Sequence, residues 1–244
     1  MISHLVANKQ SLVNDPAPYR LPILDREGES VGSLRLVNNV AAEDVNVLAD
    51  LTAWRRSSMR YFLTHFEPSE ERTHRWLLDT AIPSIDRLFF LLETEPGVFI
   101  GNIGVTAIRS SSAELDNLLR GRRGGRPDFI YLAECALLWW LFADPERDTA
   151  TLRVFSNNSL TISLHLTVGF RKTGSEPLFL HPAGQEHGYT LQHGGRTADF
   201  AYDEMTITRR RFHACNPWTI AAFQALPVDT LRRTGAAHER GRPV

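Results

Sequence analysis

The sequence AELDNLLRGRRGGRPDFIYLAECALLWWLFA, residues 113–143, decides the fold class of this 244-residue chain. It predicts a strand at 112–119, a loop with Gly121, Gly124 and Gly125, and a buried helix from Phe129. Glycine lets backbone amides turn inward, and with the positive end of the following helix they form an anion site fit for a pyrophosphate. Four arginines of the loop add charge for phosphate oxygens: Arg120, Arg122, Arg123 and Arg126.

The segments around this stretch alternate between strands and helices. Helical spacing predicts helices over 41–62, 69–82 and 158–168, and Gly169 provides a left-handed end for the last of these. Alternation and turn signals predict strands within 21–38 and over 87–93, 98–108, 149–155, 171–180 and 200–208. The order β-α-α-β-β-β-α-β-α-β-β predicts an α/β (α+β) fold with at least one right-handed crossover.

Composition excludes several classes of protein. Lys plus Arg is 27 and Asp plus Glu is 28, a balance that points neither to nucleic acid nor to an anionic membrane surface. The apolar run 129–143 contains Glu134 and is shorter than the roughly 20 residues of a membrane span. Cys135 and Cys215 form no C-x-x-C pair and no signal peptide is visible, so we expect a cytoplasmic protein. Neither G-x-x-x-x-G-K-[ST] nor G-x-G-x-x-G occurs, which argues against kinases and nicotinamide dehydrogenases.

A second informative stretch is LRVFSNNSLTISLHLTVGF, residues 152–170. Its strand–Asn–helix–Gly-Phe layout, following the glycine-rich loop, resembles the GCN5-related (GNAT) N-acyltransferase superfamily. Many members carry N-x-x-A-x-x-x-Y-x-x-x-G-F here. Asn158 takes the Asn position, Thr161 the Ala position, His165 the Tyr position, and Gly169-Phe170 the final pair.

The resemblance covers about 31–208 and implies a mixed central sheet splayed at its middle strands, with flanking helices. It implies that acetyl-CoA or another acyl-CoA is the co-substrate, that its pantetheine arm pairs with backbone at Leu118 and Leu119, and that Asn158 contributes to the cofactor site. Its pyrophosphate would sit on the loop from Arg122 to Pro127. The loop departs from the usual [QR]-x-x-G-x-[GA] pattern, because Arg123 stands where a glycine is expected after Arg120.

The resemblance also suggests residues for proton transfer. A tyrosine is often proposed to protonate the departing thiolate, and His165 could donate that proton instead. A thiol with a pKa of about 8.5 also leaves readily without such help, so His165 could equally have no catalytic part. Glu114 and Asp116 lie two apart on a strand and share a face, so either could take the proton of the amine. Alternatively, both form salt bridges with nearby arginines.

A narrower likeness is to bacterial members that acylate nucleotide-linked amino sugars. It is carried by WRRSSMRYFLTHFEPSEERTHRWL (54–77), GNIGV (101–105) and AELDNLLRG (113–121), with Arg56 in place of the usual Asn after W-R. The acceptor site would then include Trp54, Arg55 and Phe62, although aromatic residues of this segment could equally be core. Ribosomal-protein and protein N-terminus acetyltransferases share parts of the same pattern.

The predicted protein is therefore an acyl-CoA-dependent N-acyltransferase that transfers an acetyl or short acyl group directly to a small-molecule amine. The alternatives are a protein N-terminal or lysine acetyltransferase and a non-catalytic acyl-CoA-binding protein. The expected divisions are an arm (1–30), the acyltransferase domain (31–210) and a partly disordered C-terminal extension (211–244). We expect no metal site, although His181, His187 and His193 recur every six residues, and the family suggests a homodimer.

Overall fold

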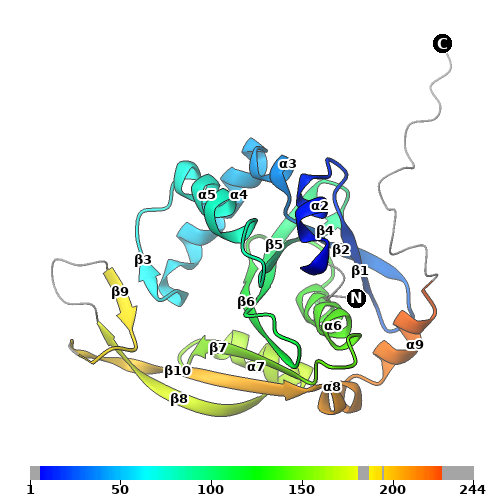
Figure 1. Ribbon diagram of the computed structural model, residues 1–244. Coiled ribbons are helices and arrows are strands. Elements are labelled where there is room, and N and C mark those ends of the chain that lie inside the picture. The colour runs from blue at the N-terminus through cyan, green and yellow to red at the C-terminus, as the bar shows by residue number, and fades with distance from the viewer. Residues whose placement is uncertain (1–5, 181–186, 194, 227–244) are drawn as a thin grey trace.

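The computed structural model describes residues 6–180, 187–193 and 195–226, and Figure 1 shows their arrangement. Ten strands form one mixed sheet. In spatial order they are β1 (Arg20–Leu24), β2 (Ser30–Leu36), β4 (Leu88–Glu95), β5 (Val98–Thr106), β6 (Ser112–Arg120), β7 (Thr149–Phe155), β10 (Thr197–Thr208), β8 (Arg171–Leu180), β9 (His187–Thr190) and β3 (Thr64–His65). Every neighbouring pair is antiparallel except β6 and β7. The predicted mixed sheet is confirmed.

Helices flank the sheet on both sides of this parallel pair. They are α2 (Lys9–Asn14), α3 (Asn39–Ala42), α4 (Val45–Ser58), a 3₁₀ turn (Met59–Tyr61), α5 (Glu70–Trp76), a π turn (Leu77–Ala81), α6 (Phe129–Phe142), α7 (Ser159–Val168), α8 (Arg209–Cys215) and α9 (Trp218–Gln224). The helix α6 is buried along almost its whole length, where it packs against β1 and β2 and touches α7 and α9. Figure 1 shows α4 and α5 together, away from α6 and near β3.

Some elements differ from the sequence prediction. The helix expected over 41–62 is broken into α3, α4 and the 3₁₀ turn, because Asn38 and Asp44 each cap a new helix with their side chains. The elements α2, β3, β9, α8 and α9 were not predicted. The expected boundary at residue 30 remains a prediction, although β1 on its N-terminal side belongs to the sheet. Of the expected C-terminal extension, residues 227–244 lie outside the described residues.

One buried ammonium group fastens α2 to the domain. Lys9 Nζ donates hydrogen bonds to the carbonyl oxygens of Ala81, Ser84 and Arg87 at 3.0, 2.6 and 2.7 Å. Burial, aided by the Arg87 charge and opposed by Asp86, lowers the pKa of Lys9 from 10.5 to about 8. The side chain thus satisfies three carbonyls at the turn that leads into β4.

Replacing Lys9 tests this fastening. We expect Lys9→Met to lower the free energy of unfolding by roughly 2–4 kcal/mol, because three carbonyl oxygens lose their donor. Because the pKa of Lys9 is lower in the folded state, the unfolded chain binds more protons between pH 8 and 10.5. The stability of the wild type relative to Lys9→Met should therefore rise across that interval. Urea denaturation at several pH values measures both effects, with Gln10→Met on the exposed side of α2 as the control.

Candidate active site

The sheet opens between β6 and β7. Four residue pairs join the two strands, from Ser112↔Thr149 to Leu115↔Leu152, and no pair follows. Beyond Leu115 the strands diverge, as Figure 1 shows, so the edge of β6 at 116–120 has no strand partner on the β7 side. Such an edge offers free backbone donors and acceptors to a ligand with amide groups of its own.

A bulge in β6 begins where the pairing with β7 ends. On the β5 side, Asn102 pairs with Leu119 and Gly104 with Asp116, so β6 carries one extra residue between these pairs. Asn117 takes a left-handed backbone conformation there (φ 53°), and Asn102 Nδ2 donates to its carbonyl oxygen at 2.5 Å. The bulge bends β6 away from β7, with Leu118 half-buried and Leu119 buried beyond it.

The glycine-rich loop follows β6 directly. The amides of Gly121 and Arg122 both donate to the carbonyl oxygen of Ile100, which fixes the start of the loop on β5. Within the described chain, the next four amides, those of residues 123–126, have no hydrogen-bond acceptor. Gly125 has a φ of +64°, a conformation that glycine adopts without strain. Four free amides before the N-terminus of α6 are donors of the kind that bind anions in other proteins, so the predicted anion site stays a prediction that this geometry allows.

Most of the loop arginines bind the protein itself. Arg122 pairs with Asp50 at 3.0 Å and donates through Nε to the Phe99 carbonyl oxygen. Arg126 pairs with Asp25 and Asp128, and hydrogen bonding to Asp128 raises its pKa. Arg120 donates to the Gly124 carbonyl oxygen at 2.9 Å. Among the described contacts, only Arg123 of the four predicted phosphate ligands has no partner.

Two predicted site residues support the loops around this opening. Trp54 is 4% exposed, and a Cβ placed on Gly121 would lie 2.1 Å from its ring, so indole and loop backbone are in direct contact. Asn158 accepts a hydrogen bond from the Thr161 amide at 3.4 Å and so caps α7. Little of the Trp54 ring remains for an acceptor to stack on.

The two candidate carboxylates have different surroundings. Glu114 is held by Arg153 through two hydrogen bonds of 3.0 and 3.1 Å. Asp116 stands at the bulge, where Oδ2 pairs with Arg87 at 3.0 Å and Oδ1 accepts from the Asn117 amide at 2.8 Å. Its side chain is 37% exposed. Both therefore form the salt bridges considered as their alternative role, but Asp116 is more accessible and lies nearer the opening.

Arg55 is packed within the predicted acceptor wall. Its guanidinium lies 3.4 Å from the centre of the Phe62 ring and 5.0 Å from that of Phe66, and Nη2 donates to the Thr64 carbonyl oxygen at 2.9 Å. Its Nε is buried without a partner. Burial lowers the pKa of Arg55 to about 10, and the Asp116 carboxylate opposes that shift. Arg55 is thus a half-buried cation that interacts electrostatically with the Asp116 carboxylate.

His165 forms a buried pair with a residue of α6. Its Nδ1 lies 2.7 Å from Glu134 Oε1, and the two side chains are 5% and 0% exposed. Glu134 Oε2 has no hydrogen-bond partner, and the described residues give His165 Nε2 none either. A carboxylate on Nδ1 fixes the tautomer of an imidazole and leaves Nε2 for a second group.

Comparison with known proteins assigns the family. The model of the acetyltransferase (GNAT) domain matches residues 34–171, more than half of the chain. The chain belongs to the GNAT acetyltransferase family. It is accordingly an acyl-CoA N-acyltransferase, and GNAT members bind CoA or acetyl-CoA as co-substrate. A search of curated proteins finds no match.

Solved structures agree on the GNAT fold at low sequence identity. The structure of spermidine N-acetyltransferase from Vibrio cholerae with CoA and spermine has a TM-score of 0.53 at 17% identity, covering 75% of this chain and 99% of that one. The structure of RimL, a ribosomal L7/L12 alpha-N-protein acetyltransferase, has a TM-score of 0.58 at 11% identity, and the match covers 78% of this chain and 94% of RimL. The structure of FdhC, a nucleotide-linked sugar GNAT, has a TM-score of 0.55 at 11% identity, and the match covers 85% of this chain and 97% of FdhC. These neighbours act on different acceptors, so they leave the substrate of this GNAT protein open.

Several residues near the GNAT splay were not predicted from sequence. Arg87 and Arg153 pair with the two carboxylates, and Tyr202 comes from β10 opposite Phe155. Burial raises the pKa of Tyr202 to about 12; Arg153 opposes this shift, whereas Asp116 and Glu114 add to it. The phenol therefore stays protonated at neutral pH. No sequence motif marks these residues, because strand pairing alone brings them to the site.

A two-residue strand pair, β3 with β9, links the segment after α4 to the far end of the sheet. Thr64 of β3 pairs with Gly188 of β9, and the Tyr189 amide donates to the Leu63 carbonyl oxygen at 2.7 Å. Tyr189 also packs edge-on against His65 and Phe155, with ring centres 5.4 and 5.5 Å apart. The hairpin arm of β8 and β9 is thereby joined to the segment that follows α4.

Other chemistry finds less support in the described residues. Burial raises the pKa of the Cys135 thiol, which stays protonated and is a poor nucleophile for a covalent acyl-enzyme. No three metal-ligating side chains gather within the part of the chain that the structure describes. His181 and the side chain of His187 lie outside that part. None of the described helices is long and apolar enough to cross a membrane.

The contact between Gly121 and Trp54 is testable. We expect Gly121→Ala to displace the indole and shift the loop, lowering the affinity for acetyl-CoA at least about tenfold and the melting temperature by several degrees. Calorimetric titration and thermal unfolding measure the two effects. The control is Gly174→Ala on β8, where a Cβ would lie 3.6 Å from its nearest contact. Unchanged binding in Gly121→Ala would mean that this contact does not shape the cofactor site.

Proposed function

We propose that this chain transfers an acetyl or short acyl group from acyl-CoA to the amino group of a small molecule, a nucleotide-linked amino sugar being the favoured acceptor. The observation that carries the proposal is the splay after Leu115, which places a free strand edge next to four free loop amides. Backbone amides of the pantetheine arm can pair with the edge, and the pyrophosphate can bind the loop amides. Asn158, as the cap of α7, and Arg123 border this cofactor region.

The β3–β9 pair favours a small acceptor over a protein terminus. A peptide needs an open groove, whereas here the hairpin arm is tied to the segment after α4. The wall thus formed carries Arg55 and Phe62, and further arginines lie at the splay. An acceptor with phosphate groups and a flat base would find cations and aromatic rings on this side.

We assign Asp116 as the group that takes the proton from the amine, directly or through a water molecule. It is the more exposed of the two carboxylates and lies at the bulge, whereas Arg153 holds Glu114 with two hydrogen bonds. The neutral amine then attacks the thioester carbonyl, and the CoA thiolate leaves. Arg87 holds the Asp116 carboxylate in place at 3.0 Å, on the side of the bulge where β6 has left β7.

We assign His165 as the donor of the proton to the departing thiolate. Glu134 accepts from Nδ1–H, so Nε2 is the atom that would exchange the proton. Because a thiolate is a good leaving group, proton donation by His165 should contribute less to the reaction rate than removal of the amine proton.

Cofactor binding is the first test. Titration calorimetry should detect acetyl-CoA with a Kd in the micromolar range, and Gly124→Glu should abolish binding because a carboxylate then occupies the anion site. Gly97→Glu in the β4–β5 turn is the control, since it adds the same charge at another positive φ but meets nothing within 4 Å. Thiol release with a nucleotide-linked amino sugar, spermidine and a peptide with a free N-terminus then compares the acceptor classes. Absence of acetyl-CoA binding would overturn the proposal, and turnover of the peptide alone would overturn the acceptor.

Substitution of the carboxylates tests the base. We expect Asp116→Asn to lower kcat/KM about 10²-fold or more, and Glu114→Gln, which keeps a hydrogen bond to Arg153, to cost less than about tenfold. Steady-state rates with the best acceptor measure both. The reverse order would transfer the role to Glu114.

His165→Phe tests the proton donor. It should lower kcat about tenfold and leave the KM for acetyl-CoA nearly unchanged. His165→Tyr restores a hydroxyl donor at this position and should recover part of the rate. A wild-type kcat in His165→Phe, with the fold intact by circular dichroism, would leave His165 a purely structural role.

A further inference from the structure

A recessed basic groove lies on the outer face of the sheet, away from the splay. It has a volume of about 590 Å³ and is lined by Arg171, Thr173, Thr206, Thr208, Arg210, Arg211 and Ala214. These residues come from β8, β10 and α8. Three of the seven are arginines and none is acidic.

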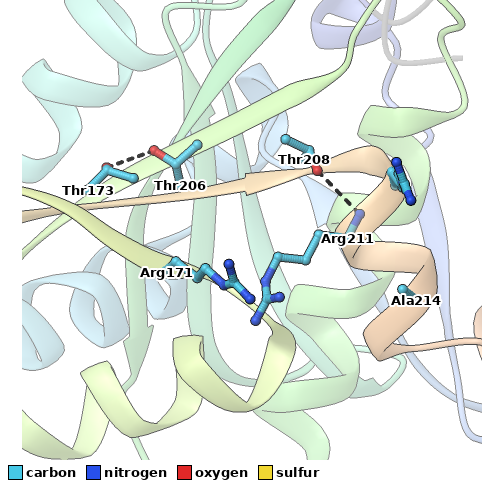
Figure 2. Close-up of a pocket in the computed structure, with 7 residues that line it drawn as sticks. Arg171, Thr173, Thr206, Thr208, Arg211 and Ala214 are labelled. Carbon is cyan, nitrogen blue, oxygen red and sulfur yellow. Dashed lines mark hydrogen bonds between the residues drawn. The ribbon is translucent and has the colours of Figure 1, made fainter.

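The guanidinium groups of this groove lack protein counter-ions. Arg171 and Arg210 have no hydrogen bond, ion pair or ring contact with any described residue. Arg211 donates through Nε to the Gly169 carbonyl oxygen at 2.5 Å, which fixes its side chain and leaves both terminal nitrogens available. Figure 2 shows the ends of Arg171 and Arg211 turned toward one another in the groove. Like charges brought together without a carboxylate favour an anion between them.

Hydroxyl groups complete the polar lining. Thr173 and Thr206 face each other across β8 and β10 with their oxygens 3.0 Å apart, and Thr208 Oγ1 accepts from the Arg211 amide at 3.3 Å. The charged neighbours Glu204 and Lys172 both have partners, and the partner of Glu204 is a residue of the lining. Glu204 accepts from Thr173 at 3.3 Å, and Lys172 pairs with Asp203 at 2.7 Å. The groove therefore offers paired guanidinium donors beside small hydroxyls, the lining that phosphate groups bind.

This groove is separate from the cofactor region. Arg211 contacts the C-terminal end of α7, whereas Asn158 caps its N-terminal end at the splay. Ten residues of helix span about 15 Å between these ends. We propose that the groove is a second binding site, specific for a dianionic phosphate group carried by a small molecule. The recess and its size suit a phosphate monoester such as a nucleoside monophosphate.

The proposal is tested by binding to the acyl-CoA-free protein. Titration calorimetry with inorganic phosphate and with AMP, in a buffer free of other multivalent anions, should show a site that persists in Gly124→Glu, where the proposed cofactor loop is blocked. Arg171→Gln should weaken it at least about tenfold, and Thr206→Val should weaken it without any change of charge. Arg75→Gln on α5 makes the same change of net charge and should leave the affinity within about twofold.

Two further comparisons distinguish the groove from the cofactor loop, and a phosphate ester from free phosphate. Gly124→Glu should remove phosphate binding at the cofactor loop and leave binding at the groove unchanged. Groove binding that persists in this variant keeps the present inference independent of the proposed function. AMP binding more tightly than phosphate would indicate a phosphate ester, and equal affinity would indicate free phosphate. The proposal is overturned if neither ligand binds, if Arg75→Gln weakens binding as much as Arg171→Gln, or if Gly124→Glu abolishes it.

Discussion

The short parallel contact between β6 and β7 is the constraint on which the rest of the structure depends. Four residue pairs hold two antiparallel halves together, and the sheet opens where they end. An extra residue in β6 at this point, with Asn117 in a left-handed conformation, prevents the ladder from continuing. Because Asn102 donates to the Asn117 carbonyl oxygen, this backbone group of the bulge is satisfied within the protein.

The loop after β6 uses charge to hold its shape and leaves its backbone free. Arg122 and Arg126 tie it to Asp50 and Asp25, which belong to distant parts of the chain. In the proposed cofactor site, an arginine engaged in this way would contribute less net charge to a bound pyrophosphate, so the four unbonded amides and the helix terminus would carry most of the anion binding. The longer loop thus compensates for its departure from the common glycine spacing by fixing its conformation with ion pairs.

The sequence was sufficient for features that depend on local pattern. The strand–loop–helix at 112–142 and the Asn158-to-Gly169 helix follow from periodicity, capping and glycine, and both are confirmed. It could not yield contacts between distant segments. The short strands β3 and β9 have no alternating pattern of their own and form only because 64–65 meets 187–188. Glu134 gave only a reason against a membrane span, since its partnership with His165 depends on how α6 and α7 pack.

Among the described residues, several buried polar side-chain atoms lack a hydrogen-bond partner, and each lowers the stability of the fold. Glu134 Oε2 and Arg55 Nε are both buried without a hydrogen bond, although an unsatisfied buried polar atom costs about 1–3 kcal/mol. An apolar pair at either place would fold at lower cost, and the described core elsewhere is largely apolar. Glu134 pairs with His165 of α7, and Arg55 packs on Phe62 in the segment after α4. Other buried side-chain atoms without a partner in the described part of the chain belong to Arg35, His65, Trp140 and His213, so such atoms are not confined to one place in the fold. Under the proposed mechanism, Glu134 and Arg55 differ from these four because polar groups fixed before the substrates arrive need no reorganisation during the reaction.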